Sequence, residues 1–409
     1  MLTGPVPTVS PGATPREVPC AASLTFDEAF ALMMSQVDPL EIREVPLVEA
    51  FGHFLADAVV ANVDAPRRDV AAMDGYAVFG DGMQFEVVGT SFPDSPTPPP
   101  LKRHEALRVF TGAPVPSGAD RVVVQESTSG DGRTVQILSP SRCGSHIRRA
   151  GSDFPAGSVL IEPGRAVCAR TIAVAAAADR DTIRIWRRPR VAVLTTGDEL
   201  APAGTARLTA NAVPDSLGPA LSVAIAAWSG VLVSASRIAD DQRSMSLAAK
   251  QAVGSADVVV VVGGASKGTK DLARASLAAH GLVPLFAGVD MKPGKPVWYG
   301  AVNGRHVLGV PGNPTAAMTV ARLFLAPLLQ RLGGHAFPKL PWRTATLVDT
   351  APASDREQFL CGKRTPQGVA LISHQRASAQ ATLADADVLV RIRPGKANPA
   401  GSIVEYIDQ

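Results

Sequence analysis

Hydrophobic residues recur along this chain with two different periods, and each change of period marks an expected structural element. Between residues 26 and 34 they fall three and four positions apart, which predicts a helix that Ser23 or Thr25 can cap. A second element is expected over 48–58. From residue 62 to 148, short strand-like runs separated by glycine and proline predict a β region without long helices.

Between residues 190 and 334 the pattern becomes a regular alternation of strands and helices. Strands are expected at 191–194, 231–236, 258–262, 282–286 and 307–310, and helices at 215–228, 242–253, 271–279 and 314–332. Such alternation is typical of a doubly wound, mostly parallel sheet, which binds ligands at the carboxyl ends of its strands. After Pro341 short strands return.

The chain is therefore predicted to have several domains and to belong to the α/β plus β class. The proline-rich residues 1–22 are expected to be a disordered tail. The remaining domains are expected to be an extended mixed domain (23–61 and 149–188), an inserted β domain (62–148), a central α/β domain (189–336) and a C-terminal β-barrel-like domain (337–409).

Composition narrows the classes of function. The 40 basic and 37 acidic residues nearly cancel, so broad attraction to nucleic acid or to a membrane is not expected and any anion site must be local. The sequence has neither an apolar run long enough to span a bilayer nor a secretory signal pattern, which favours a cytoplasmic protein. The 4 cysteines lie far apart, without the spacing of a zinc site.

Polar residues gather in the loops that follow the α/β strands. Glu199, in the segment TTGDE, offers the oxygen ligands that Mg²⁺ prefers. A glycine-rich loop after Val262 can point backbone amides at an anion, and it contains Gly263, Gly264, Ser266 and Gly268. Taken alone, the first loop could also be a turn with capping carboxylates, and the second a tight turn that needs positive φ.

Three further segments carry candidate binding residues. Lys292 and Lys295 stand on the rigid turn KPGKP, which suits a phosphate or another oxyanion. In GVPGNP, Asn313 can cap the following helix and Gly312 permits close approach to a flat ligand; Pro311 belongs to the same loop. Asp74 lies in AAMDGYAV. The plain alternatives are a solvated turn, an ordinary helix cap and an Asp-Gly β-turn.

The segments AAMDGYAV, RVFTGAPVPSGADRVVVQE, RRAGSDFPAGS, LTTGDEL, GGASKGTKD, MKPGKP and GVPGNP occur in an order and spacing that resemble the molybdopterin molybdenumtransferases. This family includes the corresponding domain of gephyrin, and the resemblance covers about residues 23–405. It implies a homodimer. It also implies that adenylylated molybdopterin and molybdate, with Mg²⁺, yield molybdenum cofactor and AMP, and that the cofactor passes to recipient molybdoenzymes.

The resemblance assigns roles to individual positions. The catalytic positions would be Asp74, Thr111, Glu199, Asp240, Asp271, Lys292 and Lys295, of which Glu199, Asp240 and Asp271 would hold the metal. The pterin-binding positions would be Gly263, Gly264, Ser266, Gly268, Pro311, Gly312 and Asn313. Asp153 matches an acidic position of the RxxGxD segment. The cleft would lie between the α/β domain of one subunit and the MDGYA-bearing domain of the other.

The chain departs from the family pattern in the glycine-rich loop and around it. Lys267, Thr269 and Lys270 stand where the family has Val, Asp and Tyr or His. Gly288 stands where the family commonly carries Phe-Trp-Lys, and Leu217 replaces an Asn.

A further departure lies near the C-terminus. The Ser of the family's Gln-Gly-Ser segment appears as Ala377, unless Ser378 replaces it through a shift. The altered positions leave open a second hypothesis, a catalytically weakened pterin-binding carrier or maturation factor. A third, a nucleotide pyrophosphatase or deamidase that uses only the α/β domain, would give the MDGYA and TGAP segments no role.

Overall fold

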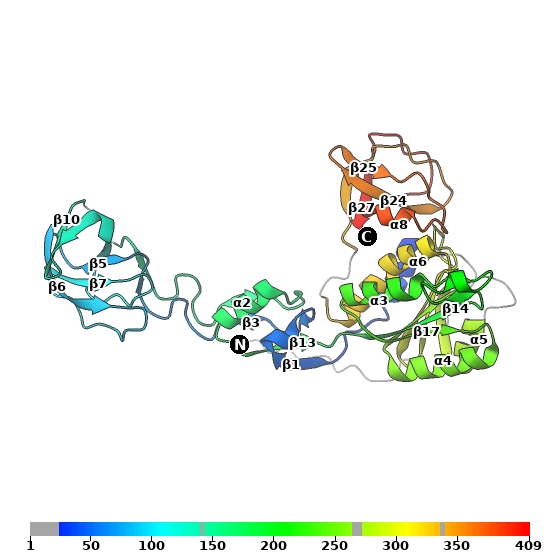
Figure 1. Cartoon of the computed structure of the whole chain (residues 1–409), viewed down its shortest axis with the longest axis horizontal. Helices are drawn as coiled ribbons and strands as arrows, with labels where there is room; N and C mark the ends of the chain where they lie inside the picture. Colours follow the sequence, from blue (N-terminus) through cyan, green and yellow to red (C-terminus); the bar gives the residue numbers. More distant parts are fainter. Residues whose placement is uncertain (1–23, 140–141, 143, 264–271, 336–339) are drawn as a thin grey trace, which may run out of the picture. The chain divides into compact units, whose positions relative to one another are not determined.

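The computed structural model describes residues 24–139, 142, 144–263, 272–335 and 340–409 (Figure 1). The chain divides into two compact units. One is Ile42–Ile185, and the other combines Trp186–Gln409 with the chain up to Glu41. Each unit has hydrophobic clusters of its own. None of the helices in the described part of the chain is long and apolar enough to cross a membrane.

The unit Ile42–Ile185 contains a six-stranded sheet with the order β8-β5-β7-β6-β10-β9. Its strands are β5 (Gly75–Val78), β6 (Gln84–Ser91), β7 (Glu105–Val109), β8 (Arg121–Val124), β9 (Thr128–Gly130) and β10 (Thr134–Ile137). Side chains alternate between its two faces, since Tyr76 and Val78 enter one cluster and Ala77 enters another. The described residues from 62 to 139 contain no α-helix, as predicted.

Short elements make up the rest of this unit. They are β1 (Ile42–Pro46), the 3-10 turn Leu47–Ala50, β2 (Phe54–Leu55), β3 (Val59–Val60), β4 (Val70–Ala71), the 3-10 turn Gln125–Ser127, β11 (Ile147–Arg148), β12 (Val159–Ile161), α2 (Ala169–Ala177) and β13 (Thr182–Trp186). The single element predicted over 48–58 is wrong. This stretch is divided between a turn and a strand, because β2 pairs with the distant β13 instead of continuing locally.

The other unit is built on a sheet with the order β17-β14-β18-β22-β21-β19. These strands are β14 (Arg190–Thr196), β17 (Val231–Ile238), β18 (Val258–Val262), β19 (Leu282–Ala287), β21 (Trp298–Val302) and β22 (Arg305–Val310). The pairs β14·β17, β14·β18 and β18·β22 are parallel, whereas β21 is antiparallel to both neighbours. The sequence pattern did not predict β21, whose central Gly300 interrupts the apolar run.

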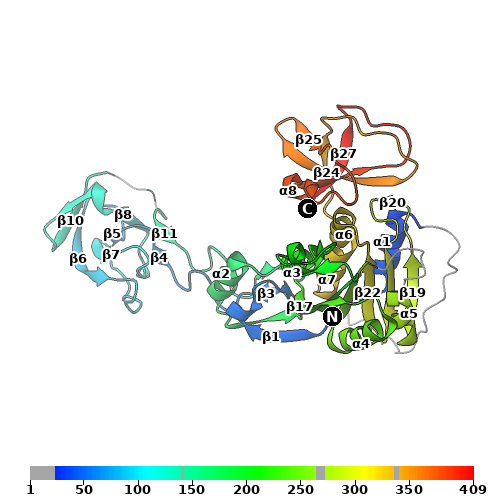
Figure 2. The same ribbon diagram turned by 45° about the vertical axis from the view of Figure 1, so that its right-hand side comes forward.

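Helices cover both faces of this sheet (Figures 1 and 2). They are α1 (Phe26–Met34), α3 (Leu217–Ala227), α4 (Gln242–Ser255), α5 (Leu272–Ala279), α6 (Pro314–Val320), the π-helical turn Ala321–Leu325 and α7 (Ala326–Leu332). Val191 and Val193 pack with α3, while Ala192 and Leu194 pack with α4. This alternation along β14 gives the α/β sheet two cores. Thr25 caps α1 as predicted, together with Glu28.

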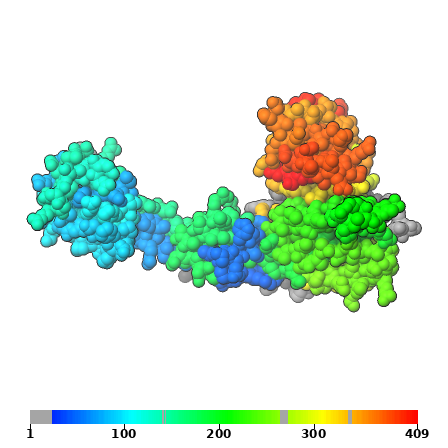
Figure 3. All heavy atoms as spheres, viewed as in Figure 1, coloured from blue at the N-terminus to red at the C-terminus, as the bar shows by residue number. Residues whose placement is uncertain are grey.

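The C-terminal strands form a separate sheet with the order β20-β24-β26-β27-β23. They are β20 (Met291–Lys292), β23 (Arg343–Thr346), β24 (Glu357–Thr365), β25 (Gly368–Leu371), β26 (Val388–Ile392) and β27 (Ile403–Asp408), and α8 (Thr382–Asp385) precedes β26. The buried Arg391 of β26 pairs with Glu357 of β24 at 2.5 Å, and it joins the sheet to α1 by pairing with Asp27 at 2.6 Å. In Figure 3 the C-terminal atoms, orange to red, adjoin the yellow α6 region. The chain is therefore multi-domain, as predicted, and the α/β sheet is mixed because β21 is antiparallel.

Short segments also cross the carboxyl edge of the α/β sheet. β15 (Leu200–Ala201) and β16 (Val213–Pro214) form a parallel pair, and a 3-10 turn lies between them at Ala206–Leu208. The backbone N–H of Asp215 donates to the Ala201 carbonyl at 2.8 Å. The loop that begins with TGDEL is thereby closed onto the start of α3.

Candidate functional site

Three loops that the sequence singled out meet at the carboxyl edge of the α/β sheet. They follow β14, β18 and β22, which are adjacent and parallel, so their ends lie side by side. A Cβ atom on Gly263 would lie 2.8 Å from Thr196 Oγ1, and one on Gly312 would lie 3.5 Å from Gly263 Cα. Gly263 also has a φ of 87°, so this contact requires glycine.

The acidic residues of this edge come from two neighbouring loops. Glu199 is exposed, and its carboxylate oxygens lie 2.8 Å from the position that a Cβ on Gly197 would take. Asp198 Oδ1 accepts a hydrogen bond from the backbone N–H of Asp240 at 2.9 Å. Asp198, which belongs to the same TTGDE segment as Glu199, thus ties this loop to the loop of Asp240. The carboxylates of Glu199 and Asp240 are oxygen ligands of the kind that Mg²⁺ prefers.

Part of the predicted site falls outside the described residues. This applies to Gly264, Ser266, Gly268 and Asp271, and also to Lys267, Thr269 and Lys270. Within the described ranges, there is no group of three or more His, Cys, Asp or Glu side chains that could hold a metal ion. The metal set Glu199, Asp240 and Asp271 remains a prediction, because Asp271 is not among those ranges.

The KPGKP turn packs against the helix that follows the PGNP loop. A Cβ on Gly294 would lie 2.7 Å from Val320 Cγ2, so only glycine fits at this contact. Lys292 and Lys295 are both exposed. Lys292 ends β20, where it pairs with Gln358 of β24. The two ammonium groups therefore stand on a turn held between α6 and the C-terminal sheet.

The PGNP loop is built differently from the prediction at one point. Asn313 occupies the N-cap position of α6 and Pro314 its first turn, but the Asn313 side chain makes no capping hydrogen bond. The Ala377 carbonyl instead accepts the backbone N–H groups of Thr315 (3.0 Å) and Ala316 (3.3 Å). Since this carbonyl replaces the cap, the exposed Asn313 amide is left available to a ligand.

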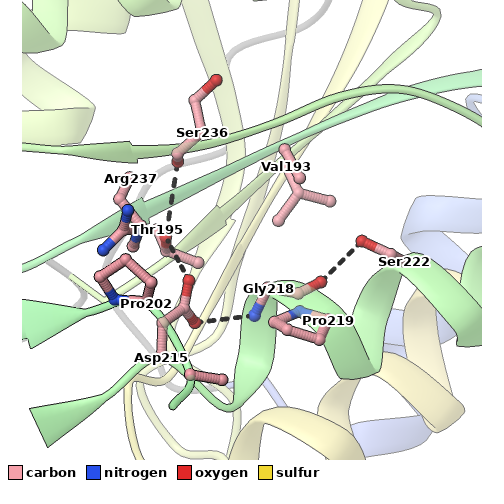
Figure 4. A pocket seen from close by; sticks show the side chains of 11 residues that line it. Val193, Thr195, Pro202, Asp215, Gly218, Pro219, Ser222, Ser236 and Arg237 are labelled. Carbon is pink, nitrogen blue, oxygen red and sulfur yellow. Dashed lines mark hydrogen bonds between the residues drawn. The ribbon is translucent and has the colours of Figure 1, made fainter. Parts of the chain in front are cut away.

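A pocket of about 360 Å³ opens beside β14, β17 and α3 (Figure 4). The buried Asp215 is one of the residues that line it. One carboxylate oxygen accepts the Gly218 N–H at 2.8 Å, and the other accepts the Thr195 hydroxyl at 3.3 Å. Ser222, Ser236 and Arg237 also line the pocket. Asp215 was missed by the sequence analysis, although the segment that contains it was noted for Leu217. The polar lining suits hydroxyl or amino groups of a ligand.

Two family departures have visible structural consequences. Leu217 is only 6% exposed and packs with Leu221 in the core below α3. It therefore offers no polar group to the pocket. Gly288 has a φ of 94° and donates its N–H to the Val297 carbonyl at 2.8 Å, a backbone conformation that disfavours any larger residue.

In the unit Ile42–Ile185, Asp74 and Thr111 are in direct contact. The Thr111 backbone N–H and hydroxyl each donate to Asp74 Oδ1 at 2.7 Å. These two hydrogen bonds, helped by the charge of Arg108, hold the pKa of Asp74 below its ordinary value. Gly75 is needed beside Asp74, because a Cβ there would lie 2.0 Å from the Val123 carbonyl oxygen of β8. Gly75 is the first residue of β5 and pairs with Val109 and Val124, so the alternative of an Asp-Gly β-turn is wrong.

Arg108 is a neighbour of this pair that the sequence did not reveal. It lies opposite Tyr76 in the β5·β7 ladder and donates from Nη1 to Tyr76 Oη at 3.2 Å. Its guanidinium also lies 5.7 Å from the Tyr76 ring centroid and 5.5 Å from that of Phe110. These contacts fix a positive charge beside the Asp74 carboxylate.

Asp153 is exposed in the turn between β11 and β12. Its backbone N–H donates to the Ala65 carbonyl at 2.9 Å. In the same RxxGxD segment, Arg149 is paired with Asp69 at 2.5 Å. The segment is therefore anchored through its backbone and Arg149, while the Asp153 carboxylate faces solvent.

Comparisons with known proteins agree with these features. Residues 24–178 match the family model of the MoeA N-terminal region (domain I and II), and residues 192–331 match that of a probable molybdopterin binding domain. Molybdopterin molybdenumtransferase 2 of Mycobacterium tuberculosis is 31% identical over 336 residues, which cover 76% of this chain and 81% of that protein.

Two further relatives match nearly the whole chain. The molybdopterin molybdenumtransferase of Staphylococcus epidermidis is 27% identical and covers 94% of this chain and 95% of its own length. A solved structure of a molybdopterin biosynthesis moeA protein from Pyrococcus horikoshii has a TM-score of 0.81 and 28% identity, covering 95% of this chain and 99% of its own. This chain therefore belongs to the molybdopterin molybdenumtransferase family.

Proposed function

We propose that the protein inserts molybdenum from molybdate into adenylylated molybdopterin and releases AMP and molybdenum cofactor. The observation that carries this proposal is the contact between Thr196, Gly263 and Gly312, which brings three substrate loops together. Gly263 permits the close contact with Thr196, and the exposed Gly312 has no side chain to keep a flat pterin away from the backbone. The cofactor would then pass to recipient molybdoenzymes.

The charged residues at this edge suit a phosphate-bearing substrate. Lys292 and Lys295 are exposed ammonium groups that can bind phosphate oxygens. Glu199 and Asp240, with Asp271, would hold Mg²⁺, and their oxygen donors fit that ion. When bound, Mg²⁺ would neutralise charge on the phosphate that leaves. Molybdenum transfer to the pterin sulfurs needs no protein nucleophile, so the residues bind and orient the substrates.

Asp74 and Thr111 would complete the site in a homodimer. We infer that the cleft lies between the α/β domain of one subunit and the MDGYA-bearing domain of the other. The finer domain division also belongs to this proposal, with an inserted domain over 62–148 and an α/β domain over 189–336. Asp74 would then enter the cleft as an ionised acceptor, oriented by Thr111.

A second candidate function is favoured by one observation. Leu217 packs into the core, so the side chain at this position cannot hydrogen bond to a substrate. A protein that lacks this contact could hold the pterin for a partner enzyme without turning it over. Turnover separates the two functions.

The deciding experiment mixes the purified protein with adenylylated molybdopterin, Mg²⁺ and micromolar molybdate. AMP release and protein-bound molybdenum are measured together, with a parallel reaction that lacks molybdate. Molybdate-dependent AMP release is expected, and it should fall strongly in Lys292→Gln but not in the exposed control Lys363→Gln. Tight pterin binding without AMP would instead support the carrier.

A further inference from the structure

The segment before α8 is held at two places, next to the PGNP loop. Gln375 Oε1 accepts the Cys361 N–H at 2.9 Å, and Gln375 Nε2 donates to the Cys361 carbonyl at 2.7 Å. Two residues later, the Ala377 carbonyl accepts the first-turn N–H groups of α6. The Thr315 hydroxyl adds a 3.0 Å bond to the Ala379 carbonyl. The backbone of this segment therefore has a fixed place beside the substrate loops.

Arg376 stands between these two anchors. Its side chain is exposed, and no group in the described part of the chain pairs with it. Adjacent Cα atoms are about 3.8 Å apart. The Cα of Arg376 therefore lies at that distance from the Cα of Ala377, the residue whose carbonyl contacts α6.

An anion at the N-terminus of α6 would have to be bound by side chains. The N–H groups of Thr315 and Ala316 already donate to Ala377, so they cannot bind an anion. Lys292 pairs with Gln358 of β24, and Gln375 is bound to Cys361 of the same strand. These two points are three residues, or about 10 Å, apart along the strand. The turn of Lys292 and the segment of Arg376 therefore both lie along β24, and both adjoin α6, through Gly294 and Ala377.

We infer that Arg376 binds a tetrahedral oxyanion of the substrates beside the PGNP loop. A guanidinium presents parallel N–H donors that match two oxygens of one phosphate or molybdate. The two sources share this chemistry, since both are oxyanions with tetrahedral oxygens. The naming of the oxyanion rests on the proposed function, whereas the anion-binding role of Arg376 does not.

The test compares the full-length wild type with Arg376→Gln, Arg376→Lys and the charge-loss control Lys363→Gln. Calorimetric titrations use molybdate alone and inorganic pyrophosphate alone, and AMP release gives KM for molybdate and for adenylylated molybdopterin. Arg376→Gln is expected to weaken binding of one oxyanion about tenfold or more, with a small change in kcat. Arg376→Lys should recover part of that affinity, because lysine restores the positive charge but lacks the two parallel N–H donors of a guanidinium.

The outcomes separate the two sources. A selective rise in KM for molybdate assigns the residue to molybdate, and a selective rise in KM for the pterin assigns it to the phosphate end. Wild-type affinities and KM values in a folded Arg376→Gln variant would overturn the inference. If the wild type releases no AMP but Arg376→Gln still loses oxyanion affinity, the proposed function fails and the inference stands.

Discussion

The Thr111 hydroxyl and backbone N–H both donate to the same carboxylate oxygen of Asp74, each at 2.7 Å. Both bonds favour the ionised carboxylate, and they lower the pKa of Asp74. The charged form of Asp74 is therefore kept to lower pH than that of an ordinary aspartate.

Loss of the Thr111 hydroxyl should change the pH dependence of the reaction. In Thr111→Val the pKa of Asp74 rises towards its ordinary value, so the acid limb of molybdate-dependent AMP release should move to higher pH. A pH profile of kcat/KM measures this shift. Thr111→Ser keeps a hydroxyl donor and serves as the matched control. Identical acid limbs in the valine variant and the wild type would show that Asp74 ionisation does not govern turnover.

The glycine at the PGNP loop offers a second prediction. A Cβ on Gly312 meets only the Cα of Gly263 at 3.5 Å, an ordinary contact, so Gly312→Ala should fold normally. The added methyl would occupy the space left for the substrate. We expect KM for adenylylated molybdopterin to rise about tenfold, a typical penalty for one methyl group in a binding pocket.

Thermal unfolding and steady-state kinetics check that prediction together. Gly254→Ala, in α4, is the control, because a Cβ at Gly254 meets nothing within 4 Å. The control should keep the wild-type KM. A wild-type KM in Gly312→Ala as well would mean that no substrate approaches this loop.

Local sequence patterns predicted most strands of the α/β sheet but missed β21. The uniform valine run Val258–Val262 is fully buried, which is why β18 was evident from the sequence. β21 was missed because Gly300 breaks its run and its place is set by pairing with β19 and β22. Asn313 has the right residue type for a cap, but the Ala377 carbonyl, far away in sequence, takes that role.

The same limit applies to the candidate site. Asp74 and Thr111 could be selected from their motifs, but Arg108 could not, because its nearness depends on the register between β5 and β7. Asp215 likewise gains its environment from Thr195, a contact between the end of β14 and the start of α3. Candidate residues within one loop can be predicted from the sequence, whereas contacts between different strands and loops are known only from the structure.

The buried Arg391 should be decisive for the stability of the C-terminal sheet. Its side chain is 3% exposed and its partner Glu357 is 6% exposed. In Arg391→Met the buried Glu357 carboxylate loses its 2.5 Å partner and keeps only Arg393, at 3.4 Å, which should cost about 3 kcal/mol of unfolding free energy. The exposed pair of Arg364 with Asp408 is the control, and Arg364→Met should cost about 1 kcal/mol or less.

Urea unfolding at pH 7 measures both variants. The double variant Arg391→Met with Glu357→Gln should recover part of the loss, because the buried charge that has lost its main partner is removed. Equal losses of unfolding free energy in Arg391→Met and Arg364→Met would show that the buried pair stabilises the protein no more than the exposed pair does. In that case the packing of Phe26 and Phe359 would hold the sheet to α1.

A buried histidine should make stability fall in mild acid. His306 Nδ1 lies 2.6 Å from Tyr299 Oη, and burial lowers the pKa of His306 to about 4. An unfolded histidine titrates near pH 6.5, so between pH 6.5 and 4 the unfolded chain binds more protons than the folded chain. Protonation therefore favours unfolding, and this group contributes a loss of about 1.4 kcal/mol for each pH unit within that window.

The measurement compares urea unfolding free energies at pH 7 and pH 5 for wild type, His306→Asn and His374→Asn. His374 is exposed, and His374→Asn is the matched control for the loss of a histidine. In His306→Asn that difference should shrink by about 1–2 kcal/mol, since the titrating group is gone. The other ionisable groups contribute equally to all three proteins and cancel in the comparison. An unchanged difference in His306→Asn would mean that this imidazole takes up as many protons in the folded as in the unfolded protein, which would contradict the lowered pKa.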